Sequence, residues 1–152
     1  MIHFRPLRFS DLQLLGHWLA QPHVVEWWGA PLSRPAIEAK YGPRIDGTSI
    51  TRVFIVEDNG AAIGWAQYTP VSDSAVEIDI TIGEISRVDK GVGSRAIRAF
   101  AEQIMAENAG IESCVAEPAP TNMRSIRAFE KAGFVPDVTK SGRWRFDRLP
   151  EG

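Results

Sequence analysis

Alternation of apolar and polar positions predicts seven short β-strands along the chain. In the run Val76-Glu-Ile-Asp-Ile-Thr-Ile82 every second residue is apolar, which is the period of a strand with one buried face. Asn59 and Gly60 separate two apolar runs, and a two-residue hairpin turn needs positive φ angles that these residues adopt readily. The predicted strands cover residues 2–8, 52–57, 62–68, 76–82, 111–117, 134–138 and 144–149.

Apolar residues at helical spacing predict four helices between these strands. The first follows Ser10, which has a capping-box spacing to Gln13, and it ends at Pro22. Ser33 is the expected N-cap of the second helix, and Gly133 closes the last one. The three later helices are predicted at residues 34–41, 91–108 and 122–132. The resulting order, β-α-α-β-β-β-α-β-α-β-β, predicts an α+β, or mixed α/β, fold.

Composition narrows the class of protein. The chain has 152 residues, which suits one domain over residues 1–152, with 44% hydrophobic and 24% charged residues. A net charge of −2 disfavours a nucleic-acid partner, and no apolar run approaches the roughly 20 residues of a membrane span. The lone cysteine, Cys114, excludes an internal disulfide. Because we also find no signal peptide, we expect a cytoplasmic location.

Charge is distributed unevenly along the chain. Between residues 46 and 84, Arg52 is the single basic residue among seven acidic ones, whereas four basic residues and Asp89 lie between residues 87 and 98. This arrangement suits a protein that brings a cationic amine to a polyanion. Exposed surface residues without a function would give the same pattern.

A glycine-rich segment, Lys90-Gly-Val-Gly-Ser94, lies between a predicted strand and a predicted helix. Its glycines let a ligand approach the backbone, and the N–H groups at a helix start favour phosphate. Gly91 to Ala96 also fits the dinucleotide pattern G-x-G-x-x-A, but the polar approach from Glu84 to Lys90 is unlike a Rossmann strand. Two alternatives remain: phosphate or pyrophosphate binding, and a helix start that merely requires glycine.

Asp79 lies in the middle of a probable central strand, on the alternation that it shares with Glu77 and Thr81. A carboxylate there is costly unless it has a partner or faces a cleft, so its position indicates a function. The alternative is that this face of the strand is exposed to solvent.

An early segment is rich in aromatic residues, with Trp27 and Trp28 after Glu26 and then Tyr41. Aromatic walls suit sugars and cations, although such residues commonly form core. No signal points to metal or covalent chemistry, because G-x-S-x-G is absent and the three histidines lack zinc-ligand spacing.

Together these segments resemble the GNAT (GCN5-related) superfamily of N-acetyltransferases. The family loop Q/R-x-x-G-x-G/A corresponds to Val88-Asp-Lys-Gly-Val-Gly93, with Val88 at the Q/R position and Arg87 one residue earlier. Asn122 and the run from Ser125 to Phe134 resemble the last helix of the family. The resemblance implies the GNAT fold, a twisted and mostly antiparallel sheet of about seven strands with about four helices. It also implies acetyl-coenzyme A as the co-substrate.

The resemblance narrows to the aminoglycoside 6'-N-acetyltransferases, and it spans roughly residues 7–134. The matching segments are His23-Val-Val-Glu-Trp-Trp-Gly29, Ile63-Gly-Trp-Ala-Gln67 and Glu117-Pro-Ala-Pro-Thr-Asn122. It implies acetyl transfer to a primary amine of a small cationic substrate, an activity that gives antibiotic resistance. It implies neither a nucleic-acid nor a membrane partner, and it leaves the oligomeric state as monomer or homodimer.

The resemblance also implies roles for individual residues. Asp79 falls where these enzymes place a candidate general base. The backbone of Thr81 and Ile82 would pair with the pantetheine arm of coenzyme A. The other cofactor-binding positions are Arg87, Lys90, Gly91, Val92, Gly93, Ser94 and Asn122. The substrate-binding positions are Glu26, Trp27, Trp28, Tyr41, Glu77 and Glu117.

Two departures from the family pattern keep alternatives open. Phe129 stands where these enzymes have a tyrosine proposed to protonate the departing thiolate, which leaves open a catalytically weak coenzyme A-binding module. The loop before the fourth strand is shortened to residues 70–75. That shortening leaves open another small acceptor, such as a polyamine or a siderophore precursor.

Overall fold

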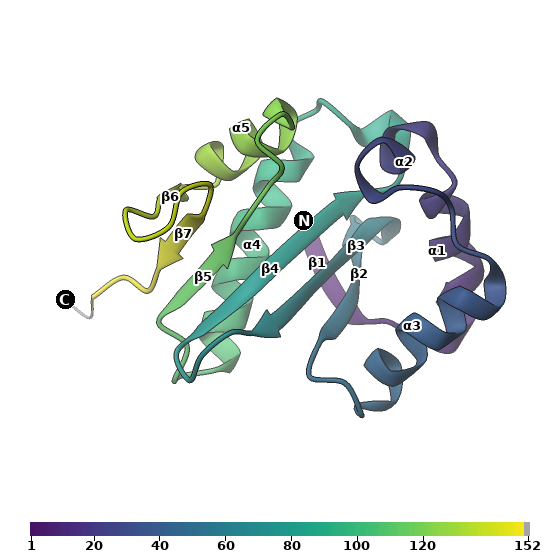
Figure 1. Ribbon diagram of the computed structural model, residues 1–152, viewed down its shortest axis with the longest axis horizontal. Coiled ribbons are helices and arrows are strands. Elements are labelled where there is room, and N and C mark those ends of the chain that lie inside the picture. The colour runs from purple at the N-terminus through teal and green to yellow at the C-terminus, as the bar shows by residue number, and fades with distance from the viewer. Residues whose placement is uncertain (151–152) are drawn as a thin grey trace.

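A computed structural model describes residues 1–150 and shows one seven-stranded sheet (Figure 1). The spatial order of its strands is β1-β2-β3-β4-β5-β7-β6, and only the pairing of β4 with β5 is parallel. The strands are β1 (Ile2–Pro6), β2 (Arg52–Asp58), β3 (Ala61–Pro70), β4 (Ala75–Ile82), β5 (Ser113–Ala116), β6 (Val135–Pro136) and β7 (Trp144–Asp147). The predicted mixed α+β class and all seven predicted strands are confirmed.

Five α-helices accompany the sheet within the described residues, one more than predicted. They are α1 (Leu12–Leu19), α2 (Pro22–Trp28), α3 (Arg34–Asp46), α4 (Val92–Glu107) and α5 (Met123–Lys131), with short 3₁₀ helices η1 (Phe9–Asp11) and η2 (Ile85–Arg87). The additional helix is α2. Pro22 does follow the end of α1, but it also starts α2, because the fixed φ of proline suits the first position of a helix.

The predicted N-cap at Ser33 and the predicted hairpin turn at Asn59 and Gly60 are confirmed. Ser33 accepts a hydrogen bond from the Ala36 N–H at 3.3 Å, and Asn59 and Gly60 have φ angles of 51° and 86° in the hairpin turn. The capping box predicted at Ser10 is wrong. Its place is taken by Asp11, whose carboxylate accepts from the Arg8 N–H at 2.8 Å.

The sheet separates two hydrophobic cores, as the alternation of β2 shows. Val53 and Ile55 pack with α1, α2 and α3, whereas Phe54 and Val56 face the core formed with α4 and α5. Figure 1 shows α4 behind the sheet and α1–α3 gathered at its other side. The two groups of helices therefore reach the sheet from opposite faces.

The strand β4 is paired unequally on its two edges. It pairs with β3 along its whole length, from Pro70↔Val76 to Gly64↔Ile82. Its parallel pairing with β5 covers only three positions and ends at Glu77↔Val115. Beyond Glu77 the edge that faces away from β3 has no strand partner among the described residues.

The close approach of β3 to the end of β4 predicts a specific sensitivity to substitution at Gly64. A Cβ atom at this position would lie 2.0 Å from the Thr81 carbonyl oxygen. The atoms of Thr81 and Ile82 that this Cβ would meet belong to the sheet backbone, so they cannot move aside as a flexible side chain would. We therefore expect Gly64→Ala to lower the free energy of unfolding by about 2 to 3 kcal/mol in urea denaturation. Gly42→Ala is the control, since that helical site is open and alanine should raise stability by up to about 1 kcal/mol. Equal stability of the two variants would contradict the close approach.

Candidate active site

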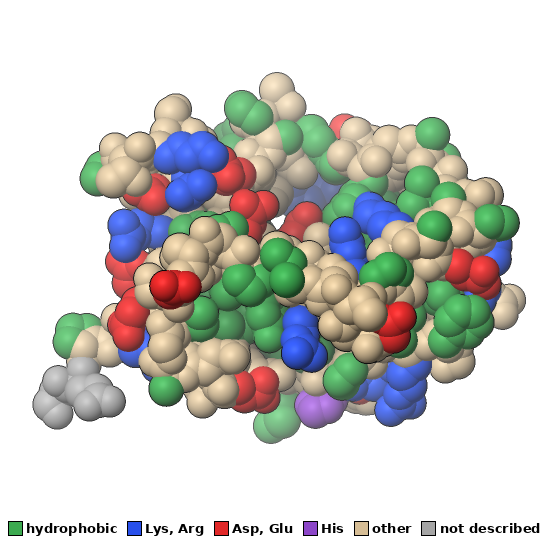
Figure 2. Space-filling model, turned by 60° about the horizontal axis from the view of Figure 1, so that its bottom comes forward, with side chains coloured by type: hydrophobic (Ala, Val, Ile, Leu, Met, Phe, Trp, Pro, Cys, Tyr) green, Lys and Arg blue, Asp and Glu red, His purple; other side chains and the backbone are tan. Residues whose placement is uncertain are grey.

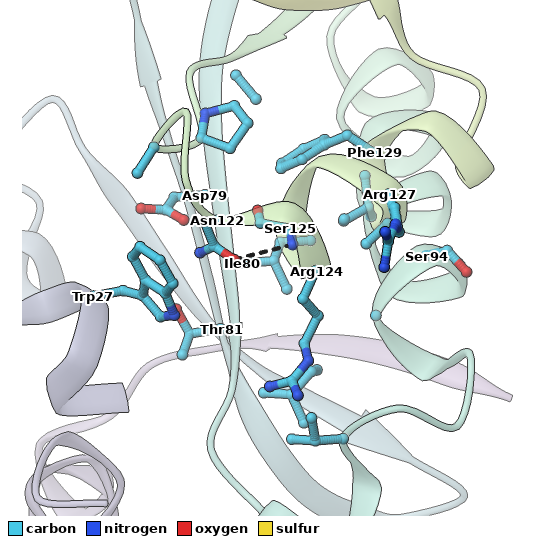
Figure 3. A pocket seen from close by; sticks show the side chains of 18 of the residues that line it. Trp27, Asp79, Ile80, Thr81, Ser94, Asn122, Arg124, Ser125, Arg127 and Phe129 are labelled. Atoms are coloured by element: carbon cyan, nitrogen blue, oxygen red, sulfur yellow. Dashed lines mark hydrogen bonds between the residues drawn. The ribbon is translucent and has the colours of Figure 1, made fainter. Parts of the chain in front are cut away.

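A cleft of about 990 Å³ lies where β4 and β5 separate. Its walls come from α2, β4, the start of α4, the segment after β5, and α5. In Figure 3, Asp79 and Trp27 lie on one side of this cleft and Ser94, Arg124 and Arg127 on the other. Figure 2 shows acidic side chains around a hollow in the surface, with basic side chains on both sides of it.

Like Glu77 two residues earlier, Asp79 brings a titratable carboxylate from β4 into this cleft. Its side chain is exposed to the cleft, but the surrounding protein excludes much of the water that would hydrate the charge. Desolvation is the main reason that the pKa of Asp79 rises to about 6. A hydrogen bond from the Ile80 backbone and the charge of Lys40 oppose this rise in pKa, whereas the charge of Glu77 adds to it.

Side chains from α1 and α2 fix the end of β4. The Trp28 indole N–H donates to Thr81 Oγ1 at 3.0 Å, and His23 Nε2 donates to the Ile82 carbonyl oxygen at 3.0 Å. Just beyond the strand, the Trp18 indole N–H donates to Glu84 at 2.8 Å. Sequence reasoning missed these contacts of Trp18 and His23, because they join segments about 60 residues apart.

Trp27 and Tyr41 differ sharply in their placement. Trp27 lines the cleft and is 41% exposed, whereas Tyr41 is completely buried in α3 and does not line the cleft. Desolvation raises the pKa of Tyr41 to about 12, and its hydroxyl group has no hydrogen-bond partner within residues 1–150. The structure thus brings Trp27, and not Tyr41, to the surface where an acceptor would lie.

The glycine-rich segment forms the N-terminus of α4. Gly91 has a φ of 74° and is the N-cap residue, a conformation that favours glycine. The Arg95 N–H is the first to bond back into the helix, at 3.4 Å to the Gly91 carbonyl oxygen. The N–H groups of residues 92–94 therefore have no partner in the described part of the chain, and they lie at the positive end of a 16-residue helix.

The basic residues near this helix start are not those expected. Arg87 lines the cleft but pairs with Asp58 at 3.0 Å, and Lys90 does not line it. The cleft also contains three basic side chains of α5, namely Arg124, Arg127 and Lys131, of which Arg124 pairs with Asp89 at 2.9 Å. Their spacing of three and four residues places them on one helical face, and this was the available signal that sequence analysis overlooked.

Two residues after β5 are already engaged within the protein. Asn122 is the N-cap of α5, and its side-chain oxygen accepts from the Ser125 N–H at 3.2 Å. Glu117 pairs with Lys140 at 2.8 Å and with Arg143 at 3.6 Å. The hydrogen bond from Lys140 is the main cause of its lowered pKa. The negative charge of Glu117 is thus partly neutralised before any ligand arrives.

Apart from Tyr41 and Lys90, the predicted site residues line this one cleft. They are Glu26, Trp27, Trp28, Glu77, Asp79, Thr81, Ile82, Arg87, Gly91, Val92, Gly93, Ser94, Glu117 and Asn122. Phe129 also lines it. Residues 1–150 contain no group of three His, Cys, Asp or Glu side chains placed to bind a metal ion. None of their helices has the length and apolar character of a membrane span.

Comparison with known proteins identifies the family. A family model described as an acetyltransferase (GNAT) domain matches residues 9–139. The aminoglycoside N(6')-acetyltransferase type 1 of Klebsiella pneumoniae is 32% identical over 148 residues, covering 88% of this chain and 73% of that protein.

Solved structures agree with this family. The crystal structure of the aminoglycoside acetyltransferase AAC(6')-Ib in complex with coenzyme A has a TM-score of 0.86 and 27% identity, covering 97% of this chain and 95% of that chain. The complex of the same enzyme with coenzyme A and kanamycin has a TM-score of 0.86 and 26% identity, with the same coverage. This chain therefore belongs to the GNAT family of acetyltransferases, and the predicted fold and family are confirmed.

The environment of Asp79 predicts an unusual titration. We expect its carboxyl ¹³C NMR signal, assigned with Asp79→Asn, to titrate at about pH 6. Since folding raises this pKa from its ordinary value of about 4, Asp79 contributes stability below pH 4 that is lost as the pH rises through 6. The stability of Asp79→Asn relative to wild type should therefore increase between pH 4 and pH 7 in urea unfolding. A titration midpoint at or below pH 4 would contradict the desolvated environment.

Proposed function

We propose that this GNAT-family chain transfers the acetyl group of acetyl-coenzyme A to a primary amine of a small cationic acceptor, in the manner of an aminoglycoside 6'-N-acetyltransferase. One observation carries the proposal: a single cleft contains both the unpaired N–H groups of the α4 N-terminus and the carboxylate of Asp79. The first suits a polyanionic acyl donor, and the second suits an ammonium. The similarity to the Klebsiella pneumoniae enzyme supports an aminoglycoside as the acceptor.

The donor end of the cleft fits a pyrophosphate. Helix α4 presents the N–H groups of residues 92–94, and a Cβ at Gly91 would meet no other segment of the chain within 4 Å, so a ligand has room there. Arg127 and Lys131 of α5 line the same cleft and add positive charge. We assign the diphosphate of coenzyme A to this end.

The open edge of β4 fits the amide-containing pantetheine arm. The Gly83 N–H bonds to the Ile63 carbonyl of β3, so by alternation the backbone groups of Ile80 and Ile82 point away from β3. The Ile82 carbonyl oxygen already accepts a hydrogen bond from His23 Nε2. Our candidate to polarise the thioester carbonyl is the N–H of Ile80, which lies on the free edge and bonds to the Asp79 carboxylate in this structure.

Asp79 would act on the acceptor amine. With a pKa of about 6 it is ionised at neutral pH, where it binds the ammonium and accepts its proton directly or through water. The free amine then bonds to the acetyl carbon as the C–S bond breaks, and the amide nitrogen loses its excess proton to water. Phe129 has no proton to give, so the coenzyme A thiolate takes one from water. Glu26, Trp27, Trp28 and Glu77 are the nearby acidic and aromatic residues of the cleft that we assign to acceptor binding.

A thiol-release assay tests this function. Mixing the protein with acetyl-coenzyme A and kanamycin should release coenzyme A, detected with a chromogenic disulfide reagent, and acetylate one amine by mass spectrometry. Spermidine and an N-hydroxylated diamine belong in the same panel, and a preference for either would assign a different acceptor. Coenzyme A binding without release from any amine would reduce the chain to a binding module.

Asp79→Asn is the matched inactive variant for that assay. We expect kcat to fall by about 10²- to 10⁴-fold, because the base is lost, while the calorimetric Kd for acetyl-coenzyme A stays unchanged. The kcat/KM of wild type should fall below pH 6 as Asp79 is protonated. Wild-type turnover by Asp79→Asn would remove this carboxylate from the mechanism.

Substitution of Gly91 tests the donor end. We expect Gly91→Val to raise the Kd for coenzyme A by about tenfold or more, since a β-branched residue strains a φ of 74° and displaces the start of α4. Gly47→Val is the matched control, because Gly47 has a φ of 88°, is equally open and lies outside the cleft. The same Kd for both variants would show that the glycine segment does not contact the donor.

A further inference from the structure

The ammonium of Lys40 lies against two aromatic rings beside the acceptor end of the cleft. Its Nζ is 5.3 Å from the centre of the Trp28 ring and 5.4 Å from that of Tyr41. Such distances are typical of a cation–π contact. Trp28 is itself a wall of the cleft and is fixed to β4 through Thr81. The aromatic position that an acceptor cation would favour is therefore already in contact with a cation of the protein.

Lys40 acts on the same carboxylate to which the acceptor is assigned. Gln67 of β3 lies directly opposite Asp79 of β4, and Arg44, one helical turn after Lys40, donates to the Gln67 side chain at 3.0 Å. This bond fixes that face of α3 over the strand pair at Asp79. The positive charge of Lys40 opposes the rise in the pKa of Asp79.

Charged groups of both signs act on Asp79. Glu77 on β4 adds negative charge, while Lys40 and Arg44 on α3 add positive charge, and the buried Tyr41 phenol stays neutral. The other acidic residues of the cleft are Glu26, Asp89, which pairs with Arg124, and Glu117, which pairs with Lys140 and Arg143. Desolvation and Arg44 lower the pKa of Lys40, and Asp79 opposes that shift.

We propose that Lys40 is a specificity-determining residue, a resident counter-ion of Asp79 that weakens the binding of acceptors carrying several positive charges. The proposal rests on the proposed function of the cleft. An acceptor with one ammonium needs only Asp79, and its approach meets one nearby cation. Lys40 and Arg44 do not line the cleft, but Lys40 lies against its Trp28 wall. A polycation that places further ammonium groups along that wall brings like charges together in a partly desolvated site. Lys40 therefore lowers the affinity of the cleft for polycations relative to acceptors with few charges. The acidic lining alone would predict the opposite preference.

Three variants separate the effect of the Lys40 charge from the effect of its packing against the aromatic rings and from the effect of the net charge of the protein. Lys40→Met retains the aliphatic contact with Trp28 and Tyr41 but removes the charge. Lys40→Arg retains the charge. Arg34→Met removes one positive charge from the same helix at an exposed site, where Arg34 pairs with Glu38 at 3.0 Å.

Calorimetric binding to the acetyl-coenzyme A-free protein measures the specificity. For Lys40→Met we expect the Kd of kanamycin, a polycation, to fall by about three- to tenfold. The Kd of 6-amino-6-deoxyglucose, a monoamine, should change less than twofold. Lys40→Arg and Arg34→Met should leave the ratio of the two Kd values at that of wild type. An unchanged ratio in Lys40→Met, or no kanamycin binding by it, would overturn the proposal.

NMR titration of Asp79 gives a readout that needs no turnover. The pKa of Asp79 should rise in Lys40→Met and stay constant in Arg34→Met. If wild type released no thiol from any amine while both the titration shift and the Kd ratio changed as stated, the proposed function would fail and the role of Lys40 would stand. An Asp79 titration identical in wild type and Lys40→Met would reject the counter-ion.

Discussion

The one-sided pairing of β4 is the constraint on which the rest of the structure depends. The strand bonds to β3 as far as Ile82, but it leaves β5 after Glu77, and the cleft occupies the space between the two diverging strands. Two glycines make this geometry possible. A Cβ at Gly64 would meet the Thr81 carbonyl at 2.0 Å, and one at Gly83 would meet the Trp18 ring at 2.2 Å. The N-terminal helices can therefore pack tightly enough to fix the free end of β4.

The two hydrophobic cores supply different parts of the cleft. The core under α1–α3 brings the aromatic and acidic side, while the core under α4 and α5 brings the helix N-terminus and the basic side. Several charges are balanced inside the protein itself, since Arg87 pairs with Asp58 and Glu117 with Lys140. The charges left to act on ligands are consequently fewer than the sequence alone suggests, and they include Asp79 and Arg127.

Prediction succeeded where the signal is local and failed where it depends on contacts. The Asn59-Gly60 turn and the Ser33 N-cap follow from the conformational preferences and hydrogen bonds of neighbouring residues, so they could be recognised directly. Helix α2 was missed because Pro22 indicates a helix end as readily as a helix start. Tyr41 was placed with the acceptor because its aromatic character was visible, whereas its complete burial depends on packing against other segments.

By itself the sequence determined the seven strands, the glycine-rich start of α4 and the position of the Asp79 carboxylate within a central strand, because periodicity, turn chemistry and a charge among apolar residues are properties of short segments. Only the tertiary structure decided which charges remain free. It paired Arg87 and Glu117 internally, brought the basic face of α5 into the cleft, and set Lys40 against the aromatic wall near Asp79. Electrostatic interactions depend on distance and desolvation between segments far apart in the chain, and these quantities are fixed only when both cores have packed.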